Sequence, residues 1–306
     1  MENQLHISVS PHIHSKRNTR SIMLDVILSL LPATAAGIVL FGGRALAVVV
    51  TCIAAAVLSE AVFNWIAKKE QTVGDLSAVV TGLLLALNLP ANLPLWQAVV
   101  GAVFAIVIVK CFFGGIGCNL VNPAITARVF MLVAFGSMAQ GAFPVDSAST
   151  ATPLVELQSG AAPDLLALFL GKNGGSIGET SVLALLIGFI YLLCRKVISW
   201  HLPVAYIGTV FLFTYAVQGD LTMSLAYIFA GGLFIGAIFM ATDYVTSPVT
   251  PLGKLIFGLG AGIITVLIRF WGNYPEGVSY AILLMNILNP FIDKWTARKV
   301  FGGNKA

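Results

Sequence analysis

Charged side chains are scarce in this chain. Lys, Arg, Asp and Glu make up only 10% of its 306 residues, hydrophobic residues make up 58%, and the mean hydropathy is +0.92. Soluble globular domains carry about a quarter charged residues. The formal net charge is +4, which gives no support to nucleic acid as a partner. This composition excludes an ordinary soluble domain and indicates a polytopic membrane protein, with the lipid bilayer as its surroundings.

Cysteine and histidine are also few. The four cysteines, Cys52, Cys111, Cys118 and Cys194, form no C-x-x-C pair, and no His stands at ligand spacing from them. Single cysteines in apolar segments are usually small core residues. This argues against an iron–sulfur cluster or other metal site within this chain alone. No constellation of nucleophile, base and metal is evident either, which argues against a stand-alone enzyme acting on lipid.

Apolar segments separated by polar and Pro/Gly breaks fill most of the chain. A membrane-spanning helix needs about 20 apolar residues. We therefore predict an all-α polytopic membrane protein with ten transmembrane helices, at residues 22–41, 45–67, 75–90, 96–113, 122–136, 177–194, 202–218, 224–242, 254–271 and 278–293.

These helices divide the chain into five parts. We predict a cytoplasmic N-terminal tail (1–21), transmembrane helices one to five (22–136), an outer loop (137–176), transmembrane helices six to ten (177–293) and a cytoplasmic C-terminal tail (294–306). The orientation rests on Lys and Arg, which are retained on the cytoplasmic side. With both termini inside, the outer segments hold only Arg44, Lys172 and Arg269.

The outer loop contains a hydroxyl-rich stretch, Asp146-Ser-Ala-Ser-Thr-Ala-Thr-Pro-Leu154. Thr152 precedes a proline, which biases it toward an extended conformation and presents its hydroxyl. Taken alone, such a stretch is also compatible with ordinary Ser/Thr turns.

The stretch resembles the flavinylation motif of the Rnf and Nqr respiratory complexes, Asp-x-x-(Ser/Thr)-x-Ala-Thr. Further segments, at 75–90, 117–123, 239–251 and 275–283, are similar to the D subunit of Rnf, so the resemblance covers essentially the whole chain. It implies FMN esterified through its phosphate to Thr152, with the motif residues Asp146, Ser149, Thr150 and Ala151. Many relatives have Gly in place of Thr150, which here leaves a second acceptor hydroxyl.

The resemblance also implies a function. The chain would be the flavin-bearing membrane subunit of a complex in the prokaryotic cytoplasmic membrane, with the flavin loop outside. That complex exchanges electrons between ferredoxin and NAD and moves Na+ or H+, and its other subunits, including a second flavin-bearing one, are the partners. One alternative is an Nqr-type B subunit passing electrons to quinone, which usually has a longer N-terminal extension than residues 1–21. The other alternative is a flavin-free channel or permease.

An inverted five-plus-five repeat with interrupted helices is a further prediction. Pro-interrupted polar stretches follow the third and eighth predicted helices (88–90 and 246–248), and Asn-Pro pairs occur in the fifth and tenth (122–123 and 289–290). Corresponding interrupted helices in two halves of opposite orientation are typical of membrane proteins that bind ligands near the midplane.

Two charged residues are candidates for an ion pathway, Glu60 and Asp243. A charge at the bilayer centre costs about 2.5–3.5 kcal/mol on insertion scales, so it faces protein or a wet cavity. We expect Glu60 to meet Lys110, and a purely structural ion pair is the alternative.

The polar residues around Asp243 predict a second cofactor site. Thr242, Asp243, Thr246 and Ser247 form an inner loop after a glycine-rich helix. About 30 Å of hydrocarbon separates the two membrane faces, a gap too wide for one electron carrier. We therefore predict a second, non-covalent flavin, riboflavin or FMN, at this loop.

Overall fold

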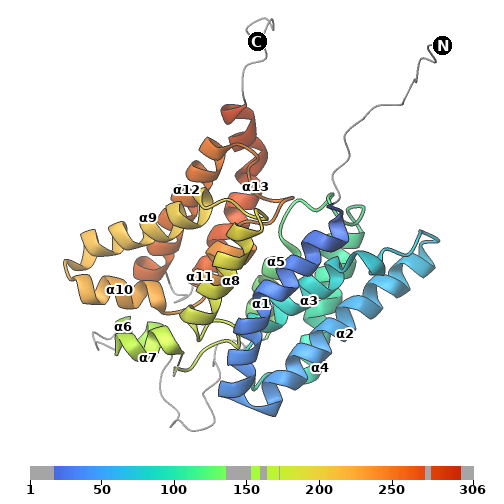
Figure 1. Ribbon diagram of the computed structural model, residues 1–306, viewed down its shortest axis with the longest axis horizontal. Helices are drawn as coiled ribbons and strands as arrows, with labels where there is room; N and C mark the ends of the chain where they lie inside the picture. Colours follow the sequence, from blue (N-terminus) through green and yellow to red (C-terminus); the bar gives the residue numbers. More distant parts are fainter. Residues whose placement is uncertain (1–16, 136–152, 159–163, 172, 273–276, 298–306) are drawn as a thin grey trace, which may run out of the picture.

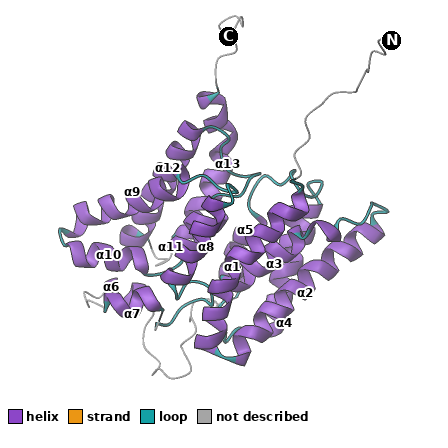
Figure 2. Ribbon diagram, viewed as in Figure 1, coloured by secondary structure: helices purple, strands orange, loops and turns teal. Residues whose placement is uncertain are grey.

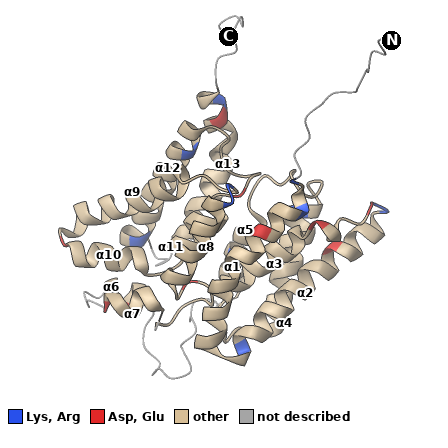
Figure 3. Cartoon of the chain, viewed as in Figure 1, with Lys and Arg blue, Asp and Glu red and all other residues tan. Residues whose placement is uncertain are grey.

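The structure is a computed structural model that describes residues 17–135, 153–158, 164–171, 173–272 and 277–297. These ranges contain helices and no β-strand, as Figure 2 shows. The prediction of an all-α protein is therefore confirmed for the described part of the chain. Figure 3 shows long stretches of helix without any charged residue.

The first group of helices precedes the hydroxyl-rich loop. It consists of α1 (Thr19–Phe41), α2 (Gly43–Ile66), the short 3-10 helix η1 (Val73–Asp75), α3 (Ser77–Leu87), α4 (Leu95–Val103), its π-helical continuation η2 (Phe104–Cys111), and α5 (Pro123–Ala134). Local sequence fixes several of these ends. The side chain of Asn18 accepts a hydrogen bond from the N–H of Ser21 at 2.9 Å, and Asn122 likewise caps α5 ahead of Pro123. Both arrangements satisfy N–H groups that a helix start leaves unpaired.

The second group follows the loop. It consists of two short helices, α6 (Pro153–Gln158) and α7 (Leu165–Leu170), and then α8 (Val182–Cys194), α9 (His201–Gln218), α10 (Leu221–Phe229), α11 (Leu233–Ile235), its π-helical continuation η4 (Gly236–Met240), α12 (Pro251–Trp271) and α13 (Val278–Thr296). The predicted outer loop thus contains two helices of its own. They are too short to show the long apolar periodicity on which the helix prediction rested.

Within the described residues, three helices are long and apolar enough to cross a membrane alone, namely α1, α2 and α12. A fourth candidate span is the pair α10 and α11–η4, whose two parts meet at 64°. Four shorter apolar helices accompany them, α3, α4–η2, α5 and α8. The chain is accordingly an integral membrane protein.

The predicted continuous helix 224–242 is broken in the structure. Gly231, between α10 and α11, has a φ of 72°. That left-handed conformation is inexpensive only for glycine. The guanidinium of Arg269 on α12 donates to the carbonyls of Tyr227 at 2.6 Å and Ala230 at 3.3 Å. These bonds satisfy carbonyl groups that the end of α10 would otherwise leave unpaired in an apolar interior.

The two groups of helices pack against one another. In Figure 1, α1 to α5 gather on the right and α9, α10 and α12 on the left, with α8 beside α1 between them. A second contact between the groups joins α5 to α13. A single large hydrophobic core, with members such as Leu30, Leu85, Ile125 and Phe257, runs through both groups.

Candidate functional site

The predicted flavin-attachment motif lies outside the described residues. This holds for Asp146, Ser149, Thr150, Ala151 and Thr152, and the description resumes at Pro153. What the structure shows is how the chain is fixed immediately after Thr152.

A small hydrophobic cluster fixes α6 to the C-terminal end of α10. Its buried members are Leu154 and Leu157 of α6, Leu168 of α7, and Ala226, Tyr227 and Ala230 around the end of α10. The amide of Gln158 donates to the carbonyl of Arg269 at 2.9 Å. Leu154 lies so close to Gly231 that a Cβ atom added there would be 2.6 Å from the Leu154 Cδ1. The segment that follows Thr152 is therefore held at the break between α10 and α11.

A buried ion pair, Arg128–Glu179, lies next to Gly232, the residue that follows Gly231 in this break. An Nη of Arg128 on α5 is 2.7 Å from Glu179, which precedes α8. Arg128 also donates to the side chain of Asn88 at the end of α3. A Cβ atom added to Gly232 would be 2.7 Å from the Glu179 carboxylate. Arg128 stands out in the sequence as a charge within an apolar segment, whereas Glu179 lies near the start of such a segment and was missed.

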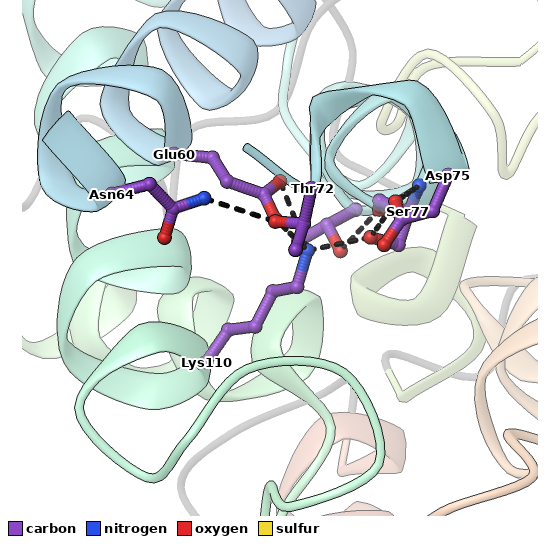
Figure 4. Close-up of polar contacts among 7 residues, drawn as sticks. Glu60, Asn64, Thr72, Asp75, Ser77 and Lys110 are labelled. Carbon is purple, nitrogen blue, oxygen red and sulfur yellow. Dashed lines mark hydrogen bonds and ion pairs between the residues drawn. The ribbon is translucent and has the colours of Figure 1, made fainter. Parts of the chain in front are cut away.

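The second buried ion pair joins Glu60 of α2 to Lys110 of η2 (Figure 4). The Lys110 ammonium lies 3.0 Å from both carboxylate oxygens of Glu60 and 2.6 Å from the hydroxyl of Ser77. Glu60 is 2% exposed and Lys110 is 3% exposed. The expectation that these two residues meet is confirmed. Lys110 belongs to a π-helical turn, a feature that is frequent at functional sites.

Hydroxyl and amide groups complete this network. The Thr72 hydroxyl donates to Glu60 at 2.6 Å and accepts from the Asn64 amide at 3.0 Å. The carboxylate of Asp75 accepts from the Ser77 N–H at 2.7 Å. Sequence reasoning missed Thr72, which lies in a loop and gives no periodic signal, and Ser77, which is the first residue of α3. Their hydrogen bonds matter, since a buried ion pair offsets its desolvation only with good geometry and satisfied remaining groups.

A cavity of about 370 Å³, here called the Asp243 cavity, opens beside this network. Its walls come from α1, α3, the start of α5, the end of α8 and the segment that follows η4. Most of the lining is apolar, and the polar lining includes Ser77, Lys110, Asn119, Asn122, Thr242 and Asp243. The cavity therefore brings the ion-pair network and the predicted second flavin site to one place.

The four residues predicted for the second flavin are divided between two neighbouring pockets. Asp243 lines the Asp243 cavity, Ser247 lines a smaller pocket beside it, and Thr242 lines both. Thr246 lines neither of these two pockets and donates to the Asp243 carboxylate at 3.1 Å. Asn119, Asn122 and Lys110 belong to the same cavity and were not among the predicted flavin residues.

Asp243 lies in the segment between η4 and α12. Burial raises the pKa of its carboxyl above the ordinary value, because an apolar environment disfavours the charged form. Hydrogen bonds from Thr246 and from the N–H groups of Val245 and Tyr244 act in the opposite direction. In the described part of the chain, no three His, Cys, Asp or Glu side chains gather as they would around a metal ion.

Known proteins resemble this chain along nearly its whole length. The model of the NQR2, RnfD, RnfE family matches residues 6–302. The D subunit of the Na+-translocating ferredoxin:NAD+ oxidoreductase complex of Acetobacterium woodii is 49% identical, over 99% of this chain and 97% of the relative. The D subunit of the proton-translocating ferredoxin:NAD+ oxidoreductase complex of Clostridium ljungdahlii is 43% identical, over 97% and 96%.

A third relative extends the comparison. The D subunit of the ion-translocating oxidoreductase complex of Stutzerimonas stutzeri is 40% identical, over 92% of each chain. The resemblance inferred from the motif segments is thereby confirmed, and the chain belongs to the NQR2, RnfD, RnfE family.

Proposed function

We propose that this chain is the flavin-bearing membrane subunit of a redox-driven, ion-translocating ferredoxin:NAD+ oxidoreductase complex, with the other subunits as its partners. The observation that carries the proposal is near-full-length identity of 49% and 43% to two D subunits of such complexes. One of those complexes is named for Na+ and the other for protons. Either ion is therefore compatible with this fold.

The proposed topology has ten spans in two inverted halves, with both termini cytoplasmic and the 137–176 connection outside. The pattern of helix contacts supports the repeat. α2 contacts α3 and α4 in the first half, and α9 contacts α10 and α12 in the second. Corresponding helices also meet across the halves, α1 with α8 and α5 with α13. Such reciprocal contacts are expected of two halves related by a pseudo-two-fold axis.

The covalent cofactor is proposed to be FMN, joined through its phosphate to Thr152. The anchoring of Leu154 and Leu157 against α10 supports this, because it fixes the chain two residues beyond the attachment point. FMN supplies one- and two-electron transfer, and the protein supplies its location and surroundings. A covalent link suits an outer-face carrier, since it prevents loss of the cofactor to the medium.

The Asp243 cavity is proposed to hold the second, non-covalent flavin. Its volume of about 370 Å³ falls in the range of small-molecule sites, as does its mostly apolar lining with a few convergent polar groups. Thr242, Asp243 and Asn119 are placed to bind the polar edge of a flavin ring, and apolar residues such as Met23 and Leu84 to contact its faces. Electrons would then pass between an outer and an inner flavin.

Glu60 and Asp243 are proposed as residues of the ion pathway. Asp243 lines the cavity directly, and Glu60 reaches it through Lys110, which is also part of the lining. A cation entering the cavity from the inner face would therefore meet the Asp243 carboxylate directly, whereas the Lys110 ammonium lies between the cavity and Glu60. The second candidate function is the Nqr-type alternative, electron transfer to quinone, because the family model that matches this chain covers NQR2 as well as RnfD.

Fluorescence of the denatured chain under ultraviolet light in a gel tests the central proposal. A wild-type band that fluoresces after coexpression with a flavin transferase shows covalent flavin, and Thr152→Val should abolish the signal. Val keeps the branched shape, so the substitution should cost about 0.5 kcal/mol or less at an outer position. Thr150→Val is the control and should retain the fluorescence. Fluorescence lost only from Thr150→Val would move the attachment by two residues, and a dark wild-type band would refute the covalent flavin.

A further inference from the structure

A small pocket of about 170 Å³ adjoins the Asp243 cavity. The two are neighbours because Val197, Ile198, Thr242 and Tyr244 line both. The rest of the small pocket's lining comprises Ser199, Leu202, Ser247, Pro248, Val249 and Lys254. It thus lies where the segment before α9 meets the segment before α12.

Half of the residues that line this pocket carry a hydrogen-bond donor in the side chain, namely Ser199, Thr242, Tyr244, Ser247 and Lys254. The ammonium of Lys254 donates to the Ser199 hydroxyl at 3.1 Å, and within the described ranges no carboxylate pairs with it. Ser247 is only 7% exposed, and its hydroxyl makes no hydrogen bond to any described residue. Ser247 lines the pocket, so its hydroxyl is available to donate a hydrogen bond to a group that binds there.

The groups around the pocket indicate that a ligand bound there would carry a negative charge. The carboxylate of Asp293 accepts from the Val249 N–H at 3.0 Å and is not part of the pocket lining. The hydroxyl of Thr242 is engaged with the Ile238 carbonyl at 2.6 Å. α9 begins at His201, and the side chain of its N-cap residue, Trp200, makes no capping hydrogen bond. The positive end of its dipole therefore adds to the Lys254 charge.

We propose that this pocket binds the phosphate group of a phosphate ester, with Lys254 as the charge partner and Ser247 as a hydroxyl donor. A phosphate presents several acceptor oxygens and a negative charge, which match one ammonium, two hydroxyls and an uncapped helix start. The remainder of the ester then extends into the Asp243 cavity or out to the membrane surface.

Two sources of that phosphate fit the position. The first is a flavin mononucleotide whose ring occupies the Asp243 cavity, and this source rests on the second flavin proposed above. The second is the headgroup of an anionic phospholipid at the membrane surface, which is independent of any flavin. Exposed Trp200 and Tyr244 beside the pocket are the side chains that membrane interfaces favour, and basic pockets there bind lipid phosphates.

Binding of FMN and of riboflavin to the flavin-depleted, intact complex tests the first source. The two probes differ only by the phosphate. The wild type should bind FMN at least about tenfold more tightly, as expected for a hydrogen bond to a charged group. Lys254→Met and Ser247→Ala should reduce that preference. Lys294→Met is the matched control, because Lys294 is an exposed lysine near the end of α13 and lies outside the pocket.

Thermal unfolding of the same complexes in nanodiscs tests the second source. Discs of phosphatidylcholine alone are compared with discs that also contain phosphatidylglycerol. A rise in Tm with the anionic lipid that is lost in Lys254→Met and kept in Lys294→Met assigns the phosphate to lipid, even where no flavin binds. Loss of the preference for FMN over riboflavin in Lys254→Met, with the preference kept in Lys294→Met, assigns the phosphate to the cofactor. Wild-type behaviour of both Lys254→Met and Ser247→Ala in both experiments would overturn the proposal.

Discussion

Removing one partner of the Glu60–Lys110 pair should destabilise the protein far more than removing both. Either single change leaves a charge buried within a network that is at most 3% exposed at the two ionic residues. Breaking a buried pair in this way costs about 3–5 kcal/mol, whereas replacing both charges is often nearly neutral. Glu60→Gln and Lys110→Met should each lower the free energy of unfolding by that amount. The double variant should stay within about 1–2 kcal/mol of wild type.

Equilibrium unfolding in detergent measures this double-mutant cycle. The interaction energy should be about 4 kcal/mol or more, larger than for independent sites, whose effects add. The pair between Asp25 and Arg195 provides the control, because the Arg195 side chain is 51% exposed. Solvent-exposed pairs contribute about 0–1 kcal/mol. Costs below about 1 kcal/mol for both single variants, or additive costs, would refute the buried, tightly coupled pair inferred from the geometry.

The double variant also distinguishes a purely structural role of Glu60 from a role in ion transport. If Glu60 is only part of a structural pair, reconstituted complex with both substitutions should move ions at the wild-type rate per electron transferred. Our proposal predicts lost or uncoupled ion movement despite near-normal stability. The measurement is ion uptake into proteoliposomes, alongside electron transfer in the same sample.

Three further predictions concern the break, the cavity and the topology. Gly231→Ala should lower the free energy of unfolding by about 2 kcal/mol or more, because it adds a Cβ atom 2.6 Å from Leu154 at a residue with a positive φ. Thermal unfolding measures this, and Gly208→Ala, with open space around its Cα, is the control. Acid extraction of active complex should release a flavin besides the covalent one, and its absence would remove the second flavin. A membrane-impermeant thiol reagent should label a cysteine at Ser159 in intact cells but not one at Thr250, and the reverse pattern would invert the topology.

The class of the protein was predictable because composition decides it. A chain with 10% charged and 58% hydrophobic residues can satisfy its backbone in lipid only as helices or as a closed barrel, and the long apolar runs favour helices. The meeting of Glu60 and Lys110 was predictable for a related reason. Two opposite charges in neighbouring apolar segments have few partners other than each other.

The break between α10 and α11 was only partly predictable. Residues 224–242 form one apolar run, and although the adjacent Gly231 and Gly232 are a turn signal, glycine is also frequent within membrane-spanning helices. The bend depends on groups far away in sequence, namely Arg269 on α12 and Leu154 on α6. The Arg128–Glu179 pair was hidden for the same reason, because its partners are separated by the loop and by two short helices.

Two kinds of buried polar residue in this protein have different physical explanations. Arg269 donates to backbone carbonyls at the end of α10, and Asn122 caps α5 and donates to the Met240 carbonyl at 3.1 Å. Such residues are needed wherever a helix ends inside an apolar environment, so they require no further role. Lys110 differs, since its ammonium contacts side-chain oxygens, satisfies no helix end and lines a cavity. A charge that the backbone does not require is the better candidate for function.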